Sequence, residues 1–160
     1  MTGRIVIMMG STSDLKQVDE ITRQLDALAV PYERRVASAH KSVAHLLAVI
    51  AQYEQSAEPL VYITVAGRSN ALSGMLDANT TRPVIACPPY SERFGGADLF
   101  SSLRMPSGVA PLVVLEPKGA ALAACKILAL ADPTLAGRIA ASQREMTAAI
   151  VAADHELQPD

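Results

Sequence analysis

The strongest constraint on the fold of this chain is its alternation of strand-like segments with segments of helical spacing. The first segment, Ile5–Met9, is apolar at every position and stops at Gly10. Strands that are apolar on both faces belong in the interior of a parallel sheet, where helices cover both faces. We expect five strands, at Ile5–Met9, Tyr32–Val36, Leu60–Val65, Pro83–Cys87 and Pro111–Leu115.

Helical spacing appears between these strands. From Asp14 to Leu28, apolar residues recur every three or four positions, which is typical of a helix that packs one face on a core. An irregular loop is expected over Tyr90–Gly96. The alternation predicts an α/β protein of three layers (α/β/α), with a five-stranded parallel sheet in flavodoxin-like order. The helices expected are Asp14–Leu28, Val43–Tyr53, Ala71–Ala78, Ala97–Leu103 and Gly119–Leu130.

The 160 residues are most simply one α/β domain, because a chain of this length can bury a core without disulfides or a structural metal. One extra helix, about Thr134–Leu157, follows the five-unit pattern. Its small residues, among them Ala136, Gly137 and Ala140, would allow another helix to approach closely. Spacing alone leaves two alternatives equal: this helix packs on its own domain, or it packs on a neighbouring subunit.

Charge and composition argue against several classes of protein. The net charge is −2 and there is no run of Lys or Arg, so nucleic acid is not an expected partner. Cys87 and Cys125 lack metal-ligand spacing, which favours two buried thiols and no metal site. No apolar run reaches membrane-spanning length, and the N-terminus does not have the pattern of a signal peptide. We therefore expect a cytoplasmic protein that has no membrane partner.

Polar or glycine-rich turns follow four of the expected strands. In open α/β sheets, ligands bind beyond the carboxyl ends of the strands, where the strand order reverses. These turns should therefore meet at one edge of the sheet and form a binding site. They are Gly10–Asp14, Ser38–Lys41, Ala66–Asn70 and the loop after Cys87.

The turn that starts at Gly10 leads from a strand into a helix. Glycine lets a ligand approach the backbone closely, and the free N–H groups at a helix start attract an anion. The turn lacks the Gly-Lys-Ser/Thr of a Walker loop, so it does not indicate ATP. Asp14 suits ribose hydroxyls better than phosphate. Alone, this turn is a weak signal, because in many α/β proteins such a turn is a capped helix start that binds no ligand.

The second turn contains His40 beside Lys41. Histidine can accept or donate a proton near neutral pH, and the lysine can pair with a phosphate or a carboxylate. Considered alone, His40 is better explained as a solvated surface histidine, and the adjacent Lys41 shifts the balance towards a functional group. Two further cations, Arg68 and Arg104, occur in the later loops. Together with Lys41 they predict a positive pocket, as an anionic substrate requires.

Five motifs occur in order at these strand ends, and their order makes a resemblance specific. In this sequence they are G-S-T-S-D from Gly10, S-A-H-K from Ser38, A-G-R-S-N-A-L-S-G from Ala66, A-C-P-P from Ala86 and S-S-L-R-M-P-S-G from Ser101. The set resembles the phosphoribosylaminoimidazole carboxylase family of purine biosynthesis, from about Ile5 to Leu130. One branch of that family rearranges an N-carboxylated aminoimidazole ribonucleotide, and the other uses free carbon dioxide. This chain resembles the carbon dioxide-using branch, class II, at two places. It has Lys41 in the second motif, and it has Arg68-Ser69-Asn70 where the mutase branch carries a second histidine.

The resemblance implies a carboxy-lyase that converts 5-aminoimidazole ribonucleotide and carbon dioxide to 4-carboxy-5-aminoimidazole ribonucleotide, without ATP, biotin, metal or other cofactor. It implies that His40 is the general acid/base. It also implies a homo-octamer whose site lies at a subunit junction and whose last helix crosses to a neighbour. The resemblance further implies that Ser11, Ser13 and Asp14, next to Gly10, bind the ribose phosphate, and that Ser38 and Lys41 line the same pocket. It implies that Gly67, Arg68 and Ser69 shape the carbon dioxide site. Arg104 would complete the anion pocket.

Two other functions are alternatives. The first is a class I-type mutase that rearranges the N-carboxy isomer on the same fold. The second is a non-catalytic nucleotide-binding module of the flavodoxin-like class.

Overall fold

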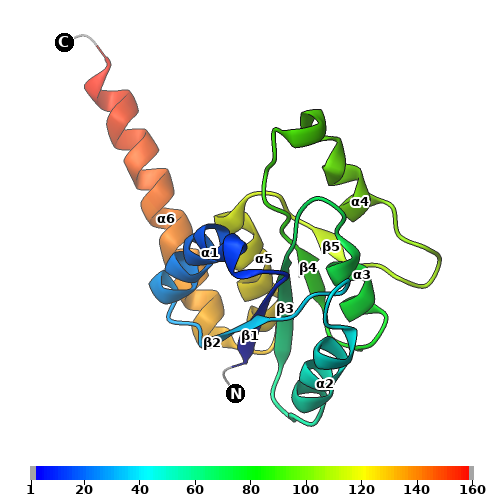
Figure 1. Ribbon diagram of the computed structural model, residues 1–160. Helices are drawn as coiled ribbons and strands as arrows, with labels where there is room; N and C mark the ends of the chain where they lie inside the picture. Colours follow the sequence, from blue (N-terminus) through cyan, green and yellow to red (C-terminus); the bar gives the residue numbers. More distant parts are fainter. Residues whose placement is uncertain (1–2, 159–160) are drawn as a thin grey trace.

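The computed structural model describes residues 3–158, in which a parallel sheet lies between two layers of helices (Figure 1). The strands are β1 (Arg4–Met9), β2 (Tyr32–Val36), β3 (Leu60–Val65), β4 (Val84–Ala86) and β5 (Leu112–Val113). The helices are α1 (Leu15–Ala27), α2 (Val43–Glu54), α3 (Ala71–Asp77), α4 (Phe100–Leu103), α5 (Pro117–Ala129) and α6 (Pro133–Glu156), with two 3-10 helices, η1 (Thr12–Asp14) and η2 (Arg93–Leu99).

The sheet has the strand order β2-β1-β3-β4-β5, and every pair is parallel. This confirms the predicted flavodoxin-like order. Ile5 of β1 pairs with Tyr32 of β2 on one side and with Val61 of β3 on the other. The order of the chain reverses between β1 and β3, so the carboxyl ends of these two strands mark the expected position of a ligand.

Strand β1 supplies side chains to both faces of the sheet. Ile5, Ile7 and Met9 pack with α1, α5 and the first turns of α6 on one face. Val6 and Met8 pack with α2 and α3 on the other face. Because successive side chains of a strand point to opposite faces, an apolar run of this kind fits only between two helical layers.

The fifth strand is shorter than its sequence suggests. The apolar pattern predicted Pro111–Leu115, whereas only Leu112–Val113 is strand. These two residues pair with Ile85 and Ala86 of β4, which is itself three residues long. An edge strand cannot extend its ladder beyond the end of its only partner, so the flanking residues of the run remain irregular.

The segment between β4 and β5 also differs from the prediction of a single helix at Ala97–Leu103. Phe94, Gly95 and Gly96 all have left-handed backbone conformations, with φ of 60°, 59° and 77°. These values are accessible to glycine and costly for phenylalanine. They kink η2, and only the four residues of α4 follow as α-helix.

Helix α6 packs on its own chain only at its start. Leu135 and Ile139 are buried against α5, and the side chain of Asp132 accepts a hydrogen bond from Leu135 N at 3.0 Å, which caps the helix. Met146 and Ile150, further along, are exposed. Figure 1 shows this part of the helix extending away from the sheet. The first alternative for this helix therefore holds for its first turns.

Both cysteines are free and buried, as expected. Burial raises the pKa of Cys87 to about 11 and that of Cys125 to about 11. Over residues 3–158, no helix combines the length and the apolar character that crossing a membrane would require.

Candidate active site

A cavity of about 650 Å³ lies at the carboxyl ends of the strands, where the order of the sheet reverses. The turns after β1, β2 and β3 and the loop after β4 all contribute to its wall, as the sequence predicted. Every predicted site residue except Arg104 lines this cavity. These residues are Gly10, Ser11, Ser13, Asp14, Ser38, His40, Lys41, Gly67, Arg68 and Ser69.

The turn after β1 is held by its own serines. Ser11 Oγ accepts hydrogen bonds from Ser13 N at 3.2 Å and from Ser13 Oγ at 3.0 Å, and Gly10 N donates to Val65 O at 3.0 Å. The last bond joins the ends of β1 and β3. Beyond this turn the chain enters η1 and then α1, so the positive end of a helical segment faces the cavity. This arrangement favours an anionic ligand.

Among residues 3–158, Asp14 is the single carboxylate that lines the cavity. Burial raises its pKa, and this effect is opposed by a hydrogen bond from the backbone of Ser11, the positive charge of Arg68 and a hydrogen bond from Ser13. A partly desolvated carboxylate accepts hydrogen bonds strongly. It repels phosphate, so its natural partners are hydroxyl groups.

His40 lies in a compact turn between β2 and α2. Ser38 N donates to Ser42 Oγ at 2.9 Å, Ser42 N donates to Ser38 O at 2.9 Å, and Lys41 N donates to Ser38 Oγ at 3.2 Å. These bonds satisfy the backbone of the turn, so the side chains of His40 and Lys41 are free. Both residues are exposed on the cavity wall. The imidazole is therefore accessible to a ligand in the cavity.

The loop after β3 has a strained backbone that neighbouring side chains hold in place. Arg68 has φ of 61°, in the left-handed region, and its N–H donates to Asp98 Oδ2 at 3.2 Å. Ser101 Oγ accepts from Asn70 N at 2.9 Å and donates to Asp98 O at 2.7 Å. Strain of this kind persists only where the surroundings fix it. The start of α4 thus positions the loop that contains Gly67, Arg68 and Ser69.

The structure does not bring Arg104 to the cavity of its own chain. It follows α4 with an extended backbone and is exposed. The chain is kinked at Phe94–Gly96, upstream of α4. The Gly95-Gly96 pair indicates a flexible point in the sequence, but it does not indicate which direction the chain takes from there. The third cation on the wall is Arg93, at the start of η2.

Sequence reasoning missed Arg93 together with Tyr90 and Ser91, which also line the cavity. These residues follow β4, so their place at the carboxyl edge of the sheet was a usable signal. The loop lacks periodicity, however, and its side-chain directions could not be predicted. Ala39, Ala66 and Pro89 also line the cavity; they lie in segments that the sequence placed at the site, although none of them was singled out. Leu72, in α3, lies outside those segments and was not predicted.

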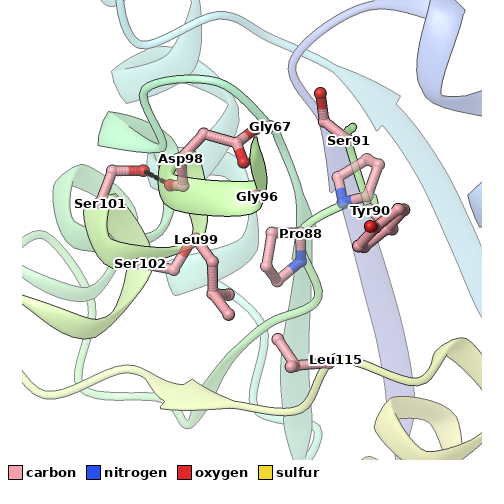
Figure 2. Close-up of a pocket in the computed structure, with 11 residues that line it drawn as sticks. Gly67, Pro88, Tyr90, Ser91, Gly96, Asp98, Leu99, Ser101, Ser102 and Leu115 are labelled. Carbon is pink, nitrogen blue, oxygen red and sulfur yellow. Dashed lines mark hydrogen bonds between the residues drawn. The ribbon is translucent and has the colours of Figure 1, made fainter. Parts of the chain in front are cut away.

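A second, smaller pocket of about 100 Å³ adjoins the cavity (Figure 2). The two share Gly67, Pro89, Tyr90 and Ser91 as lining residues. Figure 2 shows Pro88, Leu99 and Leu115 facing one another across this space. We call it the side pocket. Its lining is mainly apolar and contains no cationic side chain.

In the part of the chain that the structure describes, no three His, Cys, Asp or Glu side chains gather in a way that could hold a metal ion. The cavity wall has three cations, Lys41, Arg68 and Arg93, against the one carboxylate of Asp14. With an exposed imidazole beside them, these groups can bind an anionic molecule and move a proton on it.

Comparison with known proteins agrees with this geometry. Residues 4–149 match the family described as AIR carboxylase. A phosphoribosylaminoimidazole carboxylase of Archaeoglobus fulgidus is 51% identical, over 97% of this chain and 85% of the relative. One of Treponema denticola is 43% identical, over 96% of this chain and 97% of the relative. A crystal structure of Treponema denticola PurE superposes with a TM-score of 0.96 at 42% identity, covering 98% of this chain and 99% of that chain. The chain belongs to the AIR carboxylase family.

Proposed function

We propose that this protein carboxylates 5-aminoimidazole ribonucleotide with free carbon dioxide to give 4-carboxy-5-aminoimidazole ribonucleotide, in purine biosynthesis, and catalyses the reverse decarboxylation. The observation that carries the proposal is the position of His40, which lines one cavity with the glycine-rich turn after β1. The relatives of Archaeoglobus fulgidus and Treponema denticola are both named phosphoribosylaminoimidazole carboxylase.

The cavity wall suits such a nucleotide. The turn from Gly10 to Ser13 and the cations Lys41 and Arg93 provide N–H groups and positive charge for the phosphate. Asp14 accepts hydrogen bonds from the ribose hydroxyls. The strained loop of Gly67, Arg68 and Ser69 then faces the ring.

The chemistry needs a single proton carrier. The aminoimidazole ring is electron-rich, and its unsubstituted carbon attacks carbon dioxide, so that a carbon–carbon bond forms and one C=O electron pair moves to oxygen as carboxylate. The ring carbon then holds both a hydrogen and the carboxylate. His40 removes that proton, the C–H electron pair restores aromaticity, and the imidazolium returns the proton to solvent. General base catalysis of this kind contributes a factor of about 10²–10⁴.

Arg104 and the outer part of α6 are accounted for by an assembly of subunits. Arg104 is exposed and does not line the cavity of its own chain, and Met146 and Ile150 of α6 are exposed. We propose a homo-octamer in which α6 packs on a neighbour and the site lies at a subunit junction, where Arg104 meets the anion pocket. Equilibrium sedimentation tests this directly, and a monomer at micromolar concentration would refute it.

The decisive experiment supplies aminoimidazole ribonucleotide and labelled bicarbonate and measures label fixed on carbon. His40→Asn should keep the fold and bind the nucleotide while turnover falls by about 10²-fold or more. His45→Asn is the matched control, because His45 is an exposed histidine of α2 that does not line the cavity, and it should behave as wild type. Near-wild-type turnover by His40→Asn would exclude this residue as the proton carrier.

The same assay separates the alternatives. Efficient conversion of the N-carboxy isomer while carbon dioxide is scavenged would identify a mutase. Calorimetric binding of the nucleotide without any bicarbonate-dependent change in ring absorbance would identify a non-catalytic binding module. The presence of Arg68, Ser69 and Asn70, and no histidine, in the loop after β3 favours the carboxylase.

A further inference from the structure

The loop between β3 and α3 places two exposed side chains on the cavity wall without the bonds of a regular element. Strand β3 ends at Val65 and α3 begins at Ala71. Between them, Arg68 and Ser69 are both exposed and line the cavity. Arg68 has a left-handed φ of 61°, which is costly for any residue other than glycine. A group outside the loop must therefore hold this conformation.

Two side chains near the start of α4 supply the acceptors that the loop needs. Asp98 Oδ2 accepts from Arg68 N at 3.2 Å. Ser101 Oγ accepts from Asn70 N at 2.9 Å. Figure 2 shows the bond between the two supports, in which Ser101 Oγ donates to Asp98 O at 2.7 Å. The amides on both sides of Ser69 are thus fixed from the same short segment.

Asp98 contributes the stronger of these two supports. A hydrogen bond to an ionised acceptor is roughly twice as strong as one between neutral groups. None of the ion pairs formed within residues 3–158 involves Asp98. The amide of Arg68 is therefore the partner that the structure gives to this carboxylate.

The kink before α4 brings Asp98 to the loop. Phe94, Gly95 and Gly96 are all left-handed, and a Cβ added at either glycine would meet nothing within 4 Å. Phe94 is 75% exposed, so burial of its ring does not offset its strained backbone. What the kink achieves is a change of direction, after which Asp98 reaches a residue 30 positions earlier in the chain.

We propose, on the basis of the carboxylase function proposed above, that Asp98 is a positioning residue for the reaction. Its carboxylate holds the amide of Arg68, and this keeps the side chains of Arg68 and Ser69 where they meet the carboxylate that forms on the ring. Negative charge develops on the oxygens of carbon dioxide as the carbon–carbon bond forms, and donors already in place stabilise that charge without reorganising. A displacement of about 1 Å in such groups can lower a rate by about 10²-fold.

Removal of the carboxylate should affect kcat and leave nucleotide binding unchanged. In Asp98→Ala, kcat for label fixed on carbon should fall by about 10²-fold. The KM for aminoimidazole ribonucleotide should stay as in wild type, because the turn after β1 still binds the phosphate; an equal fall in kcat and kcat/KM marks an interaction made in the transition state. Asp98→Asn should recover most of the lost kcat, since its amide oxygen can accept from Arg68 N. Both variants should keep the shape of the wild-type pH profile, because His40 moves the proton.

Asp77 provides a matched control for a purely structural role. Its Oδ2 accepts from Ala110 N at 2.8 Å, and Asp77 and Asp98 are both partly buried. Neither Asp77 nor Ala110 lines the cavity. Asp77→Ala and Asp98→Ala should each lower the urea midpoint by about 0.5 M, but Asp77→Ala should keep the wild-type kcat. In hydrogen exchange, the amide of Arg68 should exchange faster only in Asp98→Ala, and that of Ala110 only in Asp77→Ala.

The kinetics of the variants decide the inference. Equal kcat values in Asp98→Ala and Asp77→Ala would overturn it, as would a loss that appears wholly as a higher KM for the nucleotide. An Asp98→Asn variant no more active than Asp98→Ala would also overturn it, because the acceptor would then be irrelevant. In those three cases wild-type protein still fixes label and the proposed function stands. Wild-type protein that fixes no label would overturn the proposed function together with this inference.

Discussion

The side chain of Asn70 joins helix α3 to helix α4, so the effect of its substitution on stability can be calculated from its hydrogen bonds. The side chain is 3% exposed. Its Oδ1 accepts from Ser73 N at 3.2 Å, which caps α3, and its Nδ2 donates to Ser102 Oγ at 2.9 Å. Losing a helix cap costs about 1 kcal/mol, and losing a buried hydrogen bond costs about 1 kcal/mol more. Asn70→Ala should therefore lower the free energy of unfolding by about 2 kcal/mol.

Urea denaturation at a fixed protein concentration measures this loss. With a slope of about 2 kcal/mol per molar urea, the midpoint should fall by about 1 M while the slope stays constant. Asn79→Ala is the control, because Asn79 follows α3, is exposed, and its Nδ2 donates to Met75 O of that helix. The control should change stability by less than about 0.5 kcal/mol.

A double-mutant cycle of Asn70→Ala with Ser102→Ala isolates the bond between the two side chains. The coupling energy should be about 1 kcal/mol, as for neighbouring partners in one hydrogen-bond network. A coupling near zero, or a loss for Asn70→Ala no larger than that of the control, would show that Asn70 does not hold α3 and α4 together.

Three further predictions concern charge, thiols and packing. Burial raises the pKa of Asp14, so the protonated group contributes stability, and this contribution is lost as pH rises from the ordinary pKa of 3.8 through the raised pKa. In urea titrations, Asp14→Asn should therefore raise the free energy of unfolding at pH 7 and leave it unchanged below pH 3.8. Equal gains at both pH values would contradict this. Cys87 and Cys125, both 0% exposed with raised pKa values, should react with a disulfide reagent at pH 8 only after denaturant is added, and rapid labelling of native protein would disprove their burial. Gly3→Ala would place a Cβ 2.6 Å from Pro59 O, so thermal unfolding should show a loss of about 1–3 kcal/mol, and an unchanged melting temperature would refute this close contact.

The sequence predicted the central strands well for a physical reason. The segments Ile5–Met9 and Leu60–Val65 have side chains buried on both faces, so every residue but Thr64 is hydrophobic and their ends are marked by polar turns. Because the carboxyl ends of parallel strands share one edge, the meeting of His40 with the turn after Gly10 followed from the strand order alone.

The loop after β4 could not be predicted in the same way. Its path depends on left-handed residues, of which Phe94 gives no signal in the sequence. This is why Arg93 was missed and Arg104 was placed in a pocket that its own chain does not bring it to. Apolar periodicity also fails to predict burial at the start of α1. Leu15 fits the helical spacing of α1, but it is the first residue of the helix and is 40% exposed.

Strand β1 is hydrogen-bonded on both sides, contributes to both cores and ends directly before Gly10, the first residue that lines the cavity. Its interior amides are therefore released to solvent only when both helical layers separate at once, and Ile7 should be among the slowest sites of hydrogen exchange. In contrast, the loops that carry His40 and Arg68 can open locally without disturbing that strand. The loops of the binding surface can thus open during turnover while strand β1, which fixes their position, stays hydrogen-bonded.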